Sequence, residues 1–270
     1  MKAVILADNI ENGGLKGEWG LSVYIEYGDK KLLLDTGSSE LFAENAVKLG
    51  IDLGDVEYAV LSHAHFDHAD GMERFFSEND KAKLYLQKSC AEDCYFKLLF
   101  IRKYIGIKKG SLSSVAARLC YTSGITKLCE GVYLVPHSTE GLSKIGKSNN
   151  MYRKTPAGWQ PDDFSHEQSL VLETEKGLVV FNSCSHGGAV NIINEVSSAF
   201  PGKKVHALIG GLHLYKKGEA EVRELAEKIK ETGIEYVCTG HCTGDKQYNI
   251  LKDILGDAAH QFRVGLTMEF

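Results

Sequence analysis

The segment LSHAHFDHAD, at positions 61–70, concentrates side chains that bind metal ions. Directly after the apolar run YAVLS it contains His63, His65, Asp67, His68 and Asp70. Residues two apart in an extended segment point to the same side, so His63 and His65 can bind one ion. Asp67 and His68, just past the bend, can bind a second ion beside it. Imidazole and carboxylate ligands around two ions leave positions open for water, as catalysis requires, whereas a structural zinc site favours a closed, cysteine-rich set.

Other histidines also stand where predicted strands end. The residues that follow the runs VYLVP, LVVFNS, VHALIGG and YVCTG are His137, His186, His213 and His241. In sheets of this kind ligands gather at the carboxyl ends of the strands, and neutral imidazole binds zinc, iron or manganese. We therefore expect one edge of the protein to be a site. An ordinary loop role remains open for His137, and His206 and His260 are interpreted as ordinary polar residues.

The run H-x-H-x-D-H resembles the signature of the metallo-β-lactamase superfamily, and other parts of the chain match that family in order. LLLDTG resembles the strand before the signature, which makes Asp35 a supporting acid, and YVCTGHCTG resembles the last motif, which makes His241 a ligand. SHEQSLVLETEKGLVVFNSC resembles the stretch between the third and fourth motifs, which implies metal ligation by His166 and Cys184. The resemblance covers about residues 1–85 and 164–270. It implies an α/β fold, the four-layer αβ/βα sandwich of this superfamily.

Three further stretches, FNSCSHGGAVNI, GGLHL and TGHCTG, resemble a narrower branch of the superfamily. That branch carries the label 7,8-dihydropterin-6-yl-methyl-4-(β-D-ribofuranosyl)aminobenzene-5′-phosphate synthase-like, which is a family label and does not fix a substrate. The chain also departs from the superfamily pattern. Asp70 stands where the superfamily often has a glycine, and its carboxylate is expected either beside the metal ligands or in solvent. Cys184 stands where many members have a metal-bridging aspartate. Either Cys184 or His186, two residues later, can be the ligand there.

The runs expected to position these residues are short, apolar and rich in β-branched side chains, as in strands buried on both faces. They are AVILA, LSVYIEY, KLLLDTG, YAVLSH, KLYLQ, VYLVPH, SLVLET, LVVFNS, VHALIGG and EYVCTGH. Turns at Gly28-Asp29 and Lys176-Gly177 predict two hairpins. ELFAENAVKLG, AVNIINEVSSAF and GEAEVRELAEKIKETG have apolar residues at helical spacing, so they are predicted to be helices between strands. We expect one domain over residues 1–270.

Residues 89–163 lack this alternation and are predicted to be an inserted lid or substrate-binding segment, partly helical. CAEDCYFKLLFIRKYIGIKKG is its predicted helix. From this segment, His137, Arg153 and Lys154 are candidates for substrate binding, the last two for a phosphate.

The bulk composition excludes several classes of protein. A formal charge of −5 and the lack of a basic cluster make nucleic-acid binding an unfavoured hypothesis. No apolar run reaches the roughly 20 residues of a membrane span, and the first residues are interpreted as a strand, with no signal-peptide pattern. Seven cysteines without C-x-x-C pairs favour reduced thiols in a cytoplasmic protein. Nothing in the sequence predicts the oligomeric state.

The hypothesis that best fits these features is a hydrolase that uses two divalent metal ions to activate water. Zinc is the metal expected first, with iron and manganese as alternatives. The expected substrate is a small phosphoester or ester, a class that includes pterin-related phosphates. Asp67 would hold an ion and orient the nucleophile, and His213 would donate to the substrate or shuttle a proton. Two alternatives are a non-haem di-iron redox protein, which lacks support because no flavin-binding segment follows, and a binding protein that keeps the fold without catalysis.

Overall fold

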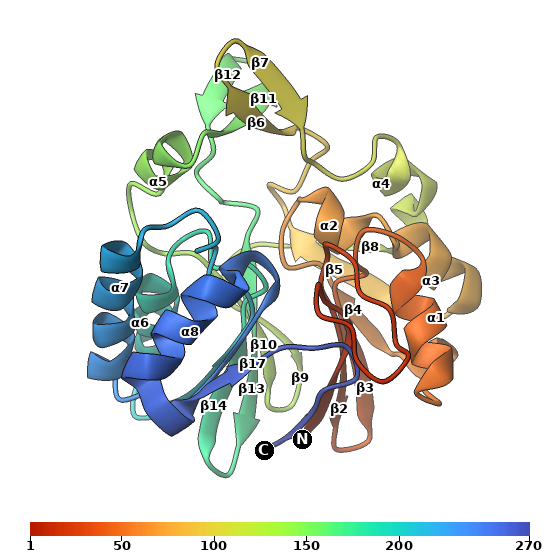
Figure 1. The fold of residues 1–270 in the computed structure, drawn as a ribbon. Helices are drawn as coiled ribbons and strands as arrows, with labels where there is room; N and C mark the ends of the chain where they lie inside the picture. The colour runs from red at the N-terminus through yellow and green to blue at the C-terminus, as the bar shows by residue number, and fades with distance from the viewer.

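The computed structural model describes all residues 1–270, and its apolar strands form two seven-stranded sheets (Figure 1). The first sheet is antiparallel at one side and parallel at the other. Its strand order is β18 (Thr267–Glu269), β1 (Lys2–Ala7), β2 (Ser22–Tyr27), β3 (Lys30–Leu34), β4 (Tyr58–Val60), β5 (Lys83–Gln87) and β8 (Leu119–Thr122). From β3 onward the pairs are parallel, so β3, β4 and β5 all end at the same edge.

The second sheet repeats this plan with the C-terminal half of the chain. Its strand order is β17 (Ala259–Gln261), β16 (Tyr236–Thr239), β15 (Val205–Ile209), β14 (Gly177–Phe181), β13 (Gln168–Thr174), β10 (Val132–Pro136) and β9 (Thr126–Cys129). The strands β14, β15, β16 and β17 run parallel. The loops that follow them therefore meet at one edge of this sheet.

Helices cover the outer face of each sheet, which gives four layers (Figure 1). On the first sheet they are α1 (Leu41–Lys48), α2 (Phe66–Ala69), α3 (Met72–Glu78) and α4 (Ser111–Ser114), and on the second α6 (Ala189–Ala199), α7 (Glu219–Glu231) and α8 (Asp245–Leu255). Single 3₁₀ turns lie at Leu53–Asp55, Ala116–Arg118, His241–Thr243 and Gly256–Ala258. The fold is thus the predicted αβ/βα sandwich.

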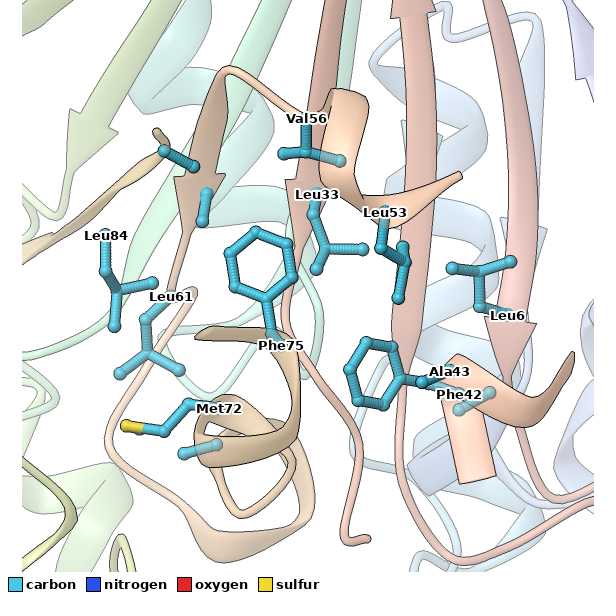
Figure 2. Close-up of a cluster of buried hydrophobic side chains, with 14 of the residues drawn as sticks. Leu6, Leu33, Phe42, Ala43, Leu53, Val56, Leu61, Met72, Phe75 and Leu84 are labelled. Carbon is cyan, nitrogen blue, oxygen red and sulfur yellow. The ribbon is translucent and has the colours of Figure 1, made fainter. Parts of the chain in front are cut away.

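Three separate apolar clusters fill the spaces between the four layers. One packs the first sheet on its helices, with Phe42 and Phe75 fully buried against Leu33 (Figure 2). The middle cluster joins both sheets, since it contains Ile25 of β2 and Leu170 of β13, and the third packs the second sheet on α6, α7 and α8. Both faces of each sheet are therefore buried, which explains why most strand sequences are continuously apolar rather than alternating.

Every run that the sequence analysis assigned to a strand or helix outside residues 89–110 forms the expected element. Both predicted hairpins are present, β2 with β3 and β13 with β14. The second turn falls at Glu175-Lys176, one residue earlier than predicted, because Gly177 already pairs with Thr174. Helix α8 and the short strands β8, β9, β17 and β18 were not predicted.

The predicted helix at the start of the insertion is wrong. Its residues form the hairpin β6 (Cys94–Leu98) and β7 (Ile101–Tyr104), with Leu99 in the left-handed region at φ 52°. Pairing with β11 (Met151–Thr155) and β12 (Gly158–Pro161) builds a separate sheet, β12-β11-β6-β7, which we call the cap sheet. Cross-strand packing of Tyr95 on Tyr104 and Trp159 stabilises strands here, and the helical spacing of the apolar residues did not reveal that pairing.

The cap sheet lies above the edge at which both main sheets end their parallel strands (Figure 1). The insertion's helical content is limited to α4 and to α5 (Ser143–Ser148), which precedes β11. No helix in the structure combines the length and apolar character that crossing a membrane requires. All seven cysteines are free thiols.

Candidate metal centre

Side chains from four strand ends meet beneath the cap sheet. The histidine run follows β4, Cys184 and His186 follow β14, His213 follows β15, and His241 follows β16. Because these strands are parallel neighbours within their sheets, the loops after them converge across the gap between the two sheets. These histidines therefore lie at one edge of the protein, as predicted.

A first set of three imidazoles is formed by His63, His65 and His186. Each offers a ring nitrogen, these nitrogens lie within 4.8 Å of one another, and all three residues are buried. The Nδ1 of His63 faces Ser62 Oγ at 2.8 Å, which directs its Nε2 away from that hydroxyl. Burial, and then the neighbouring histidines, hold the pKa of His63 and His186 well below the usual value, and burial lowers the pKa of His65 to about 3. The rings are therefore neutral, which is the form that binds metal.

A second set lies beside the first and combines a carboxylate with imidazoles. Asp67, His68 and His241 offer atoms within 4.8 Å of one another. His241 Nε2 lies 3.3 Å from Asp67 Oδ2 and 3.2 Å from His68 Nε2. Burial alone would raise the pKa of the Asp67 carboxyl, but the adjacent His68 and the hydrogen bond with His241 hold it well below its usual range. The carboxylate is therefore charged at neutral pH.

Acidic and amide groups fix the outward nitrogens of this second set. Asp35 Oδ2 lies 2.8 Å from His68 Nδ1, and Asn9 Oδ1 lies 3.3 Å from His241 Nδ1. Asp35 also accepts hydrogen bonds from the backbone N–H and the hydroxyl of Ser62, both at 2.7 Å. With the Nδ1 atoms held, the Nε2 atoms point inward, as metal-ligating histidines require. This is the supporting position that the sequence analysis assigned to Asp35.

Cys184 lies between the two sets. Its Sγ is 3.2 Å from His68 Nε2, and it forms one close group with His63 and His68 and another with His241 and Cys242. Burial, and then the neighbouring Cys242, raise the pKa of the Cys184 thiol well above its ordinary value, so in the absence of a cation the thiol keeps its proton. Cys184 and His186 therefore both lie at the site, His186 within the first set and Cys184 between the two sets.

The donor atoms of the two sets fit divalent metal ions. The Nε2 atoms of His63 and His65 and both ring nitrogens of His186 are buried and have no hydrogen-bond partner. Buried polar atoms without a partner are unfavourable in a folded protein unless something else satisfies them. Imidazole, carboxylate and thiol ligands suit zinc, iron and manganese, and the geometry does not choose among these metals.

A cavity of about 670 Å³ opens over both sets. Its floor contains His65, Asp67, Cys184 and His186 from the two sets. Its walls are mostly apolar and come from both the body and the cap sheet: Trp19, Phe66, Phe96, Leu98, Lys103, Ile101, Ile105, Met151, His213, Tyr215, Lys216 and Cys242. A concave, largely apolar space with a few convergent polar groups is typical of a small-molecule site.

Comparison with known proteins agrees with this architecture. The model of the metallo-β-lactamase superfamily matches residues 20–146. A solved metal-dependent hydrolase of the β-lactamase superfamily, Tm1679, superimposes with a TM-score of 0.87 and 27% sequence identity, covering 100% of this chain and 99% of that one. Residues 20–146 thus match the metallo-β-lactamase superfamily, and the chain has the fold of that superfamily. At 26% identity it is also similar to the 7,8-dihydropterin-6-methyl-4-(β-D-ribofuranosyl)-aminobenzene-5′-phosphate synthase of Methanocaldococcus jannaschii, over 96% of this chain and 92% of that protein.

One residue that the resemblance implied to be a metal ligand, His166, belongs to neither of the two sets. Its Nδ1 accepts a hydrogen bond from the backbone N–H of Ala64 at 3.2 Å, and its Nε2 lies 3.1 Å from Asp162 Oδ2. Both ring nitrogens of His166 thus have partners within the protein, and its role as a metal ligand stays a prediction. His166 precedes β13 and His186 follows β14, and because these strands are antiparallel the two residues lie at the same edge.

The three residues expected to bind substrate lie elsewhere. His137 is enclosed between Glu167, whose Oε2 is 2.5 Å from Nε2, and Glu195, whose Oε2 is 2.9 Å from Nδ1. Arg153 pairs with Asp93 at 3.0 Å and donates to the carbonyl oxygen of Ser89. Lys154 is exposed on β11, and none of the three lines the cavity. Their positions therefore contradict the substrate-binding prediction.

His213 and Asp70 both lie near the site, but only His213 lines the cavity. His213 lines the cavity, with its ring 4.6 Å from that of His186, and it belongs to neither ligand set. Burial lowers the pKa of His213 to about 4, so the ring is neutral at pH 7. Asp70 accepts a hydrogen bond from the backbone N–H of Lys108 at 2.8 Å, so it anchors the segment after β7 rather than any ligand.

Sequence reasoning missed three residues around the site. Cys242 places its Sγ 3.4 Å from that of Cys184, and its signal was its position next to His241 in TGHCTG. Glu167 accepts hydrogen bonds from the backbone N–H groups of His186 and Gly187 and so fixes the His186 loop. Asp8 accepts from the N–H of His241 at 2.9 Å. Single acidic residues next to apolar strands give no pattern that predicts such contacts.

Proposed function

We propose that this protein is a hydrolase that uses two divalent metal ions to activate water toward a small molecule. The observation that carries the proposal is the pair of adjoining ligand sets with unpartnered, buried imidazole nitrogens on the floor of a large cavity. A structural metal would instead favour a closed, saturated ligand set without a cavity above it. His63, His65 and His186 would hold one ion, and Asp67, His68 and His241 the other, with Cys184 between them.

Divalent ions held there supply Lewis acidity and lower the pKa of water from 15.7 toward about 7. The protein's own contribution lies in charge and orientation. The Asp67 carboxylate stays ionised, so one of its oxygens can accept a hydrogen bond from the attacking water. His213 faces the cavity as a neutral ring and can donate a hydrogen bond to the substrate or pass a proton to the leaving group.

The cavity walls favour a substrate with an aromatic or apolar body and a negative group. Trp19, Phe96 and Tyr215 supply aromatic faces, and Lys103 and Lys216 supply positive charge. Lys216 Nζ lies 4.6 Å from the centre of the Phe96 ring, so its ammonium group is held at the wall. We infer a phosphoester or ester of an aromatic compound, a class that includes pterin-related phosphates.

A synthase reaction is the second candidate. The M. jannaschii relative is named for a product that joins a dihydropterin, an aminobenzene and a ribose phosphate. The aromatic walls of this cavity would suit a planar partner in such a reaction as well. Product analysis separates the two: hydrolysis incorporates one oxygen from ¹⁸O-labelled water into product, whereas condensation of two substrates does not.

Metal content and activity test the proposal together. We expect about two equivalents of divalent metal per chain in these two sets, measured by elemental analysis on protein purified without chelator. His63→Ala should lose metal and reduce turnover of aryl phosphodiesters, phosphomonoesters and esters by at least about 100-fold. His260→Ala is the matched control, because His260 lies on β17, where its ring stacks on Tyr236 of β16 away from the site. Two firmly bound irons with reversible optical bands would favour redox chemistry, and full metal content without turnover of the panel would favour a binding protein.

A further inference from the structure

The tip of the β6–β7 hairpin exposes four large apolar side chains in a row. Leu98, Leu99, Phe100 and Ile101 are 62%, 78%, 97% and 70% exposed. The tip belongs to the cap sheet, which forms the end of the molecule opposite to the two chain termini (Figure 1). Single exposed apolar residues are common on protein surfaces, whereas a contiguous group of them is typical of an interaction site.

A ligand in the cavity cannot cover this whole group. Leu98 and Ile101 line the cavity, but Leu99 and Phe100 do not. A molecule bound over the metal centre would therefore leave the two outermost side chains in water. The partner that covers them has to approach from outside, at the end of the cap sheet.

The surface around the tip is strongly basic. Residues 94–109 and 143–161, which contain the cap sheet and α5, have nine lysines and arginines and no aspartate or glutamate. Because the formal charge of the whole chain is −5, the remaining residues carry −14. The two stretches are far apart in sequence, and the pairing of β11 with β6 brings them together. The cap sheet is thus the positive end of an otherwise acidic protein.

Most of these cations are available to a partner. Lys108 pairs with Glu73 and Arg153 pairs with Asp93, and the other seven have no ion-pair partner within the chain. The guanidinium group of Arg102 lies 4.4 Å from the centre of the Trp159 ring. A protruding apolar tip with cations and a tryptophan beside it is the arrangement that suits the boundary between water and lipid.

We propose that the β6–β7 tip docks the protein onto a membrane surface that contains anionic phospholipids. Leu99 and Phe100 enter the boundary between head groups and acyl chains, and the surrounding lysines and arginines contact the lipid phosphates. Such a contact is reversible and needs no spanning segment. Since Leu98 and Ile101 also line the cavity, docking places the cavity next to the lipid surface. The proposal is independent of the hydrolase reaction.

A nucleic acid and a second copy of this chain are the competing partners. Base stacking would use the ring of Phe100, but it gives no reason for the exposed aliphatic side chains of Leu99 and Ile101. Two cap sheets that met tip to tip would bring like charges together, which opposes association. An anionic lipid surface satisfies both the apolar group and the charge.

Co-sedimentation with lipid vesicles tests the proposal on the whole chain. We expect binding to vesicles of phosphatidylcholine with added phosphatidylglycerol, no binding to phosphatidylcholine alone, and weaker binding at high salt. Phe100→Ser should weaken binding by about tenfold or more, because the ring that enters the lipid is lost. Lys97→Gln and Lys154→Gln should each weaken it by about fivefold. Val47→Ser is the matched control, because Val47 is 70% exposed but lies on α1, outside the cap sheet.

Three results would overturn the proposal. The first is no binding to anionic vesicles, or equal binding by wild type and Phe100→Ser. The second is displacement of the protein from vesicles by single-stranded RNA together with tighter binding to that RNA, which assigns the surface to nucleic acid. The third is a wild-type dimer in sedimentation velocity that Phe100→Ser converts to a monomer, which assigns the tip to a second copy.

The same variant separates this proposal from the proposed function. Phe100 is almost entirely in water and does not line the cavity, so Phe100→Ser should keep the circular dichroism spectrum of wild type. Its metal content, and its turnover of the soluble substrate panel without vesicles, should also match wild type. A failure of vesicle binding would therefore leave the hydrolase proposal untouched, and a failure of hydrolysis would leave membrane docking untouched.

Discussion

The buried triad of His137, Glu167 and Glu195 allows a quantitative prediction about stability. The imidazole is hydrogen-bonded to both carboxylates, and all three side chains are at most 7% exposed. Burial alone would lower the pKa of His137, but the bonds to Glu167 and Glu195 raise it to about 10. The ring is therefore a buried imidazolium whose charge balances two carboxylates.

His137→Gln removes this charge and leaves the two carboxylates without their cation. Breaking a buried ion pair by removing one partner costs about 3–5 kcal/mol. Each carboxylate keeps two backbone N–H donors, from His186 and Gly187 for Glu167 and from Ser138 and Thr139 for Glu195, and the glutamine amide replaces one further bond. We therefore expect the low end of the range, a loss of about 3 kcal/mol in the free energy of unfolding at pH 6–7.

The pH dependence of this loss gives a sharper test than its size. Because the folded pKa of His137 lies above its unfolded value of about 6.5, its contribution is complete below pH 6.5 and is lost as pH rises toward 10. The pKa values of Glu167 and Glu195 are lowered by contact with His137 against the opposing effect of burial. Their contribution is present above about pH 4.5 and is lost as pH falls through their folded pKa values.

Urea unfolding followed by tryptophan fluorescence and circular dichroism, at pH 6, 8 and 10, measures this difference. The gap between wild type and His137→Gln should be widest at pH 6 and close steadily by pH 10. His206→Gln is the control, since its partner Glu235 is 55% exposed and such a pair contributes less than about 1 kcal/mol. A gap below about 1 kcal/mol at pH 6, or one that does not change with pH, would refute the assignment of a charged imidazole.

Three further predictions concern packing, the turn after the histidine run, and metal binding. Phe75→Ala removes a fully buried ring from the cluster in Figure 2, so urea titration should find a loss of about 3–5 kcal/mol; a loss below 1 kcal/mol would contradict this packing. Gly71→Ala places a Cβ 2.1 Å from the carbonyl oxygen of Thr36 and should cost about 2 kcal/mol or more. Gly218→Ala, with 3.7 Å to the nearest atom, should cost only about 0.5–1 kcal/mol, because alanine is a poorer N-cap for α7 than glycine. Removal of divalent metal with a chelator should lower Tm by about 10 °C and zinc should restore it, because an ion at 1,000 times its Kd stabilises the folded state by about 4 kcal/mol; an unchanged Tm would argue against tight binding.

The sequence predicted the two main sheets well because burial on both faces leaves a strong local signal. Continuous β-branched runs such as LVVF and HALI have no alternative that buries them as fully. The helices α1, α6 and α7 were equally visible, because each has one apolar stripe. The short strands β17 and β18 were not, because three residues give no periodicity, and each exists through its pairing with a neighbour distant in sequence.

The cap sheet escaped prediction for a related reason. Phe96, Leu99, Phe100 and Ile101 follow one another closely enough to mimic a helical stripe. In the structure Phe100 is 97% exposed at the tip of the hairpin, so these residues do not bury a common face. Strand structure is imposed there by β11, more than 50 residues later in the chain. A window of sequence contains no information about such a partner.

The candidate site likewise combines residues that short sequence motifs reveal with contacts between residues distant in the chain. The histidine run, His186 and His241 were found because each follows a strand, and strand ends are readable. Most of the residues that orient these side chains were not predicted. The backbone conformation at the site depends on them. Asp35, Ser185, His213 and His241 all have φ between 48° and 59°, a left-handed conformation that is uncommon for residues other than glycine.

Such strain concentrates at functional sites, where surrounding contacts hold the backbone in place. At His241 the contacts are a hydrogen bond from its own N–H to Asp8, which is more than 230 residues away, and the ring contact with Asn9. At Ser185 the N–H donates to the side chain of Asn182. Short motifs thus reveal which side chains can bind a metal. The orientation of those side chains depends on partners that only the folded chain brings together. A glycine at position 241 would relieve this strain, but it would remove the imidazole that the His241 ring adds to the set with Asp67 and His68.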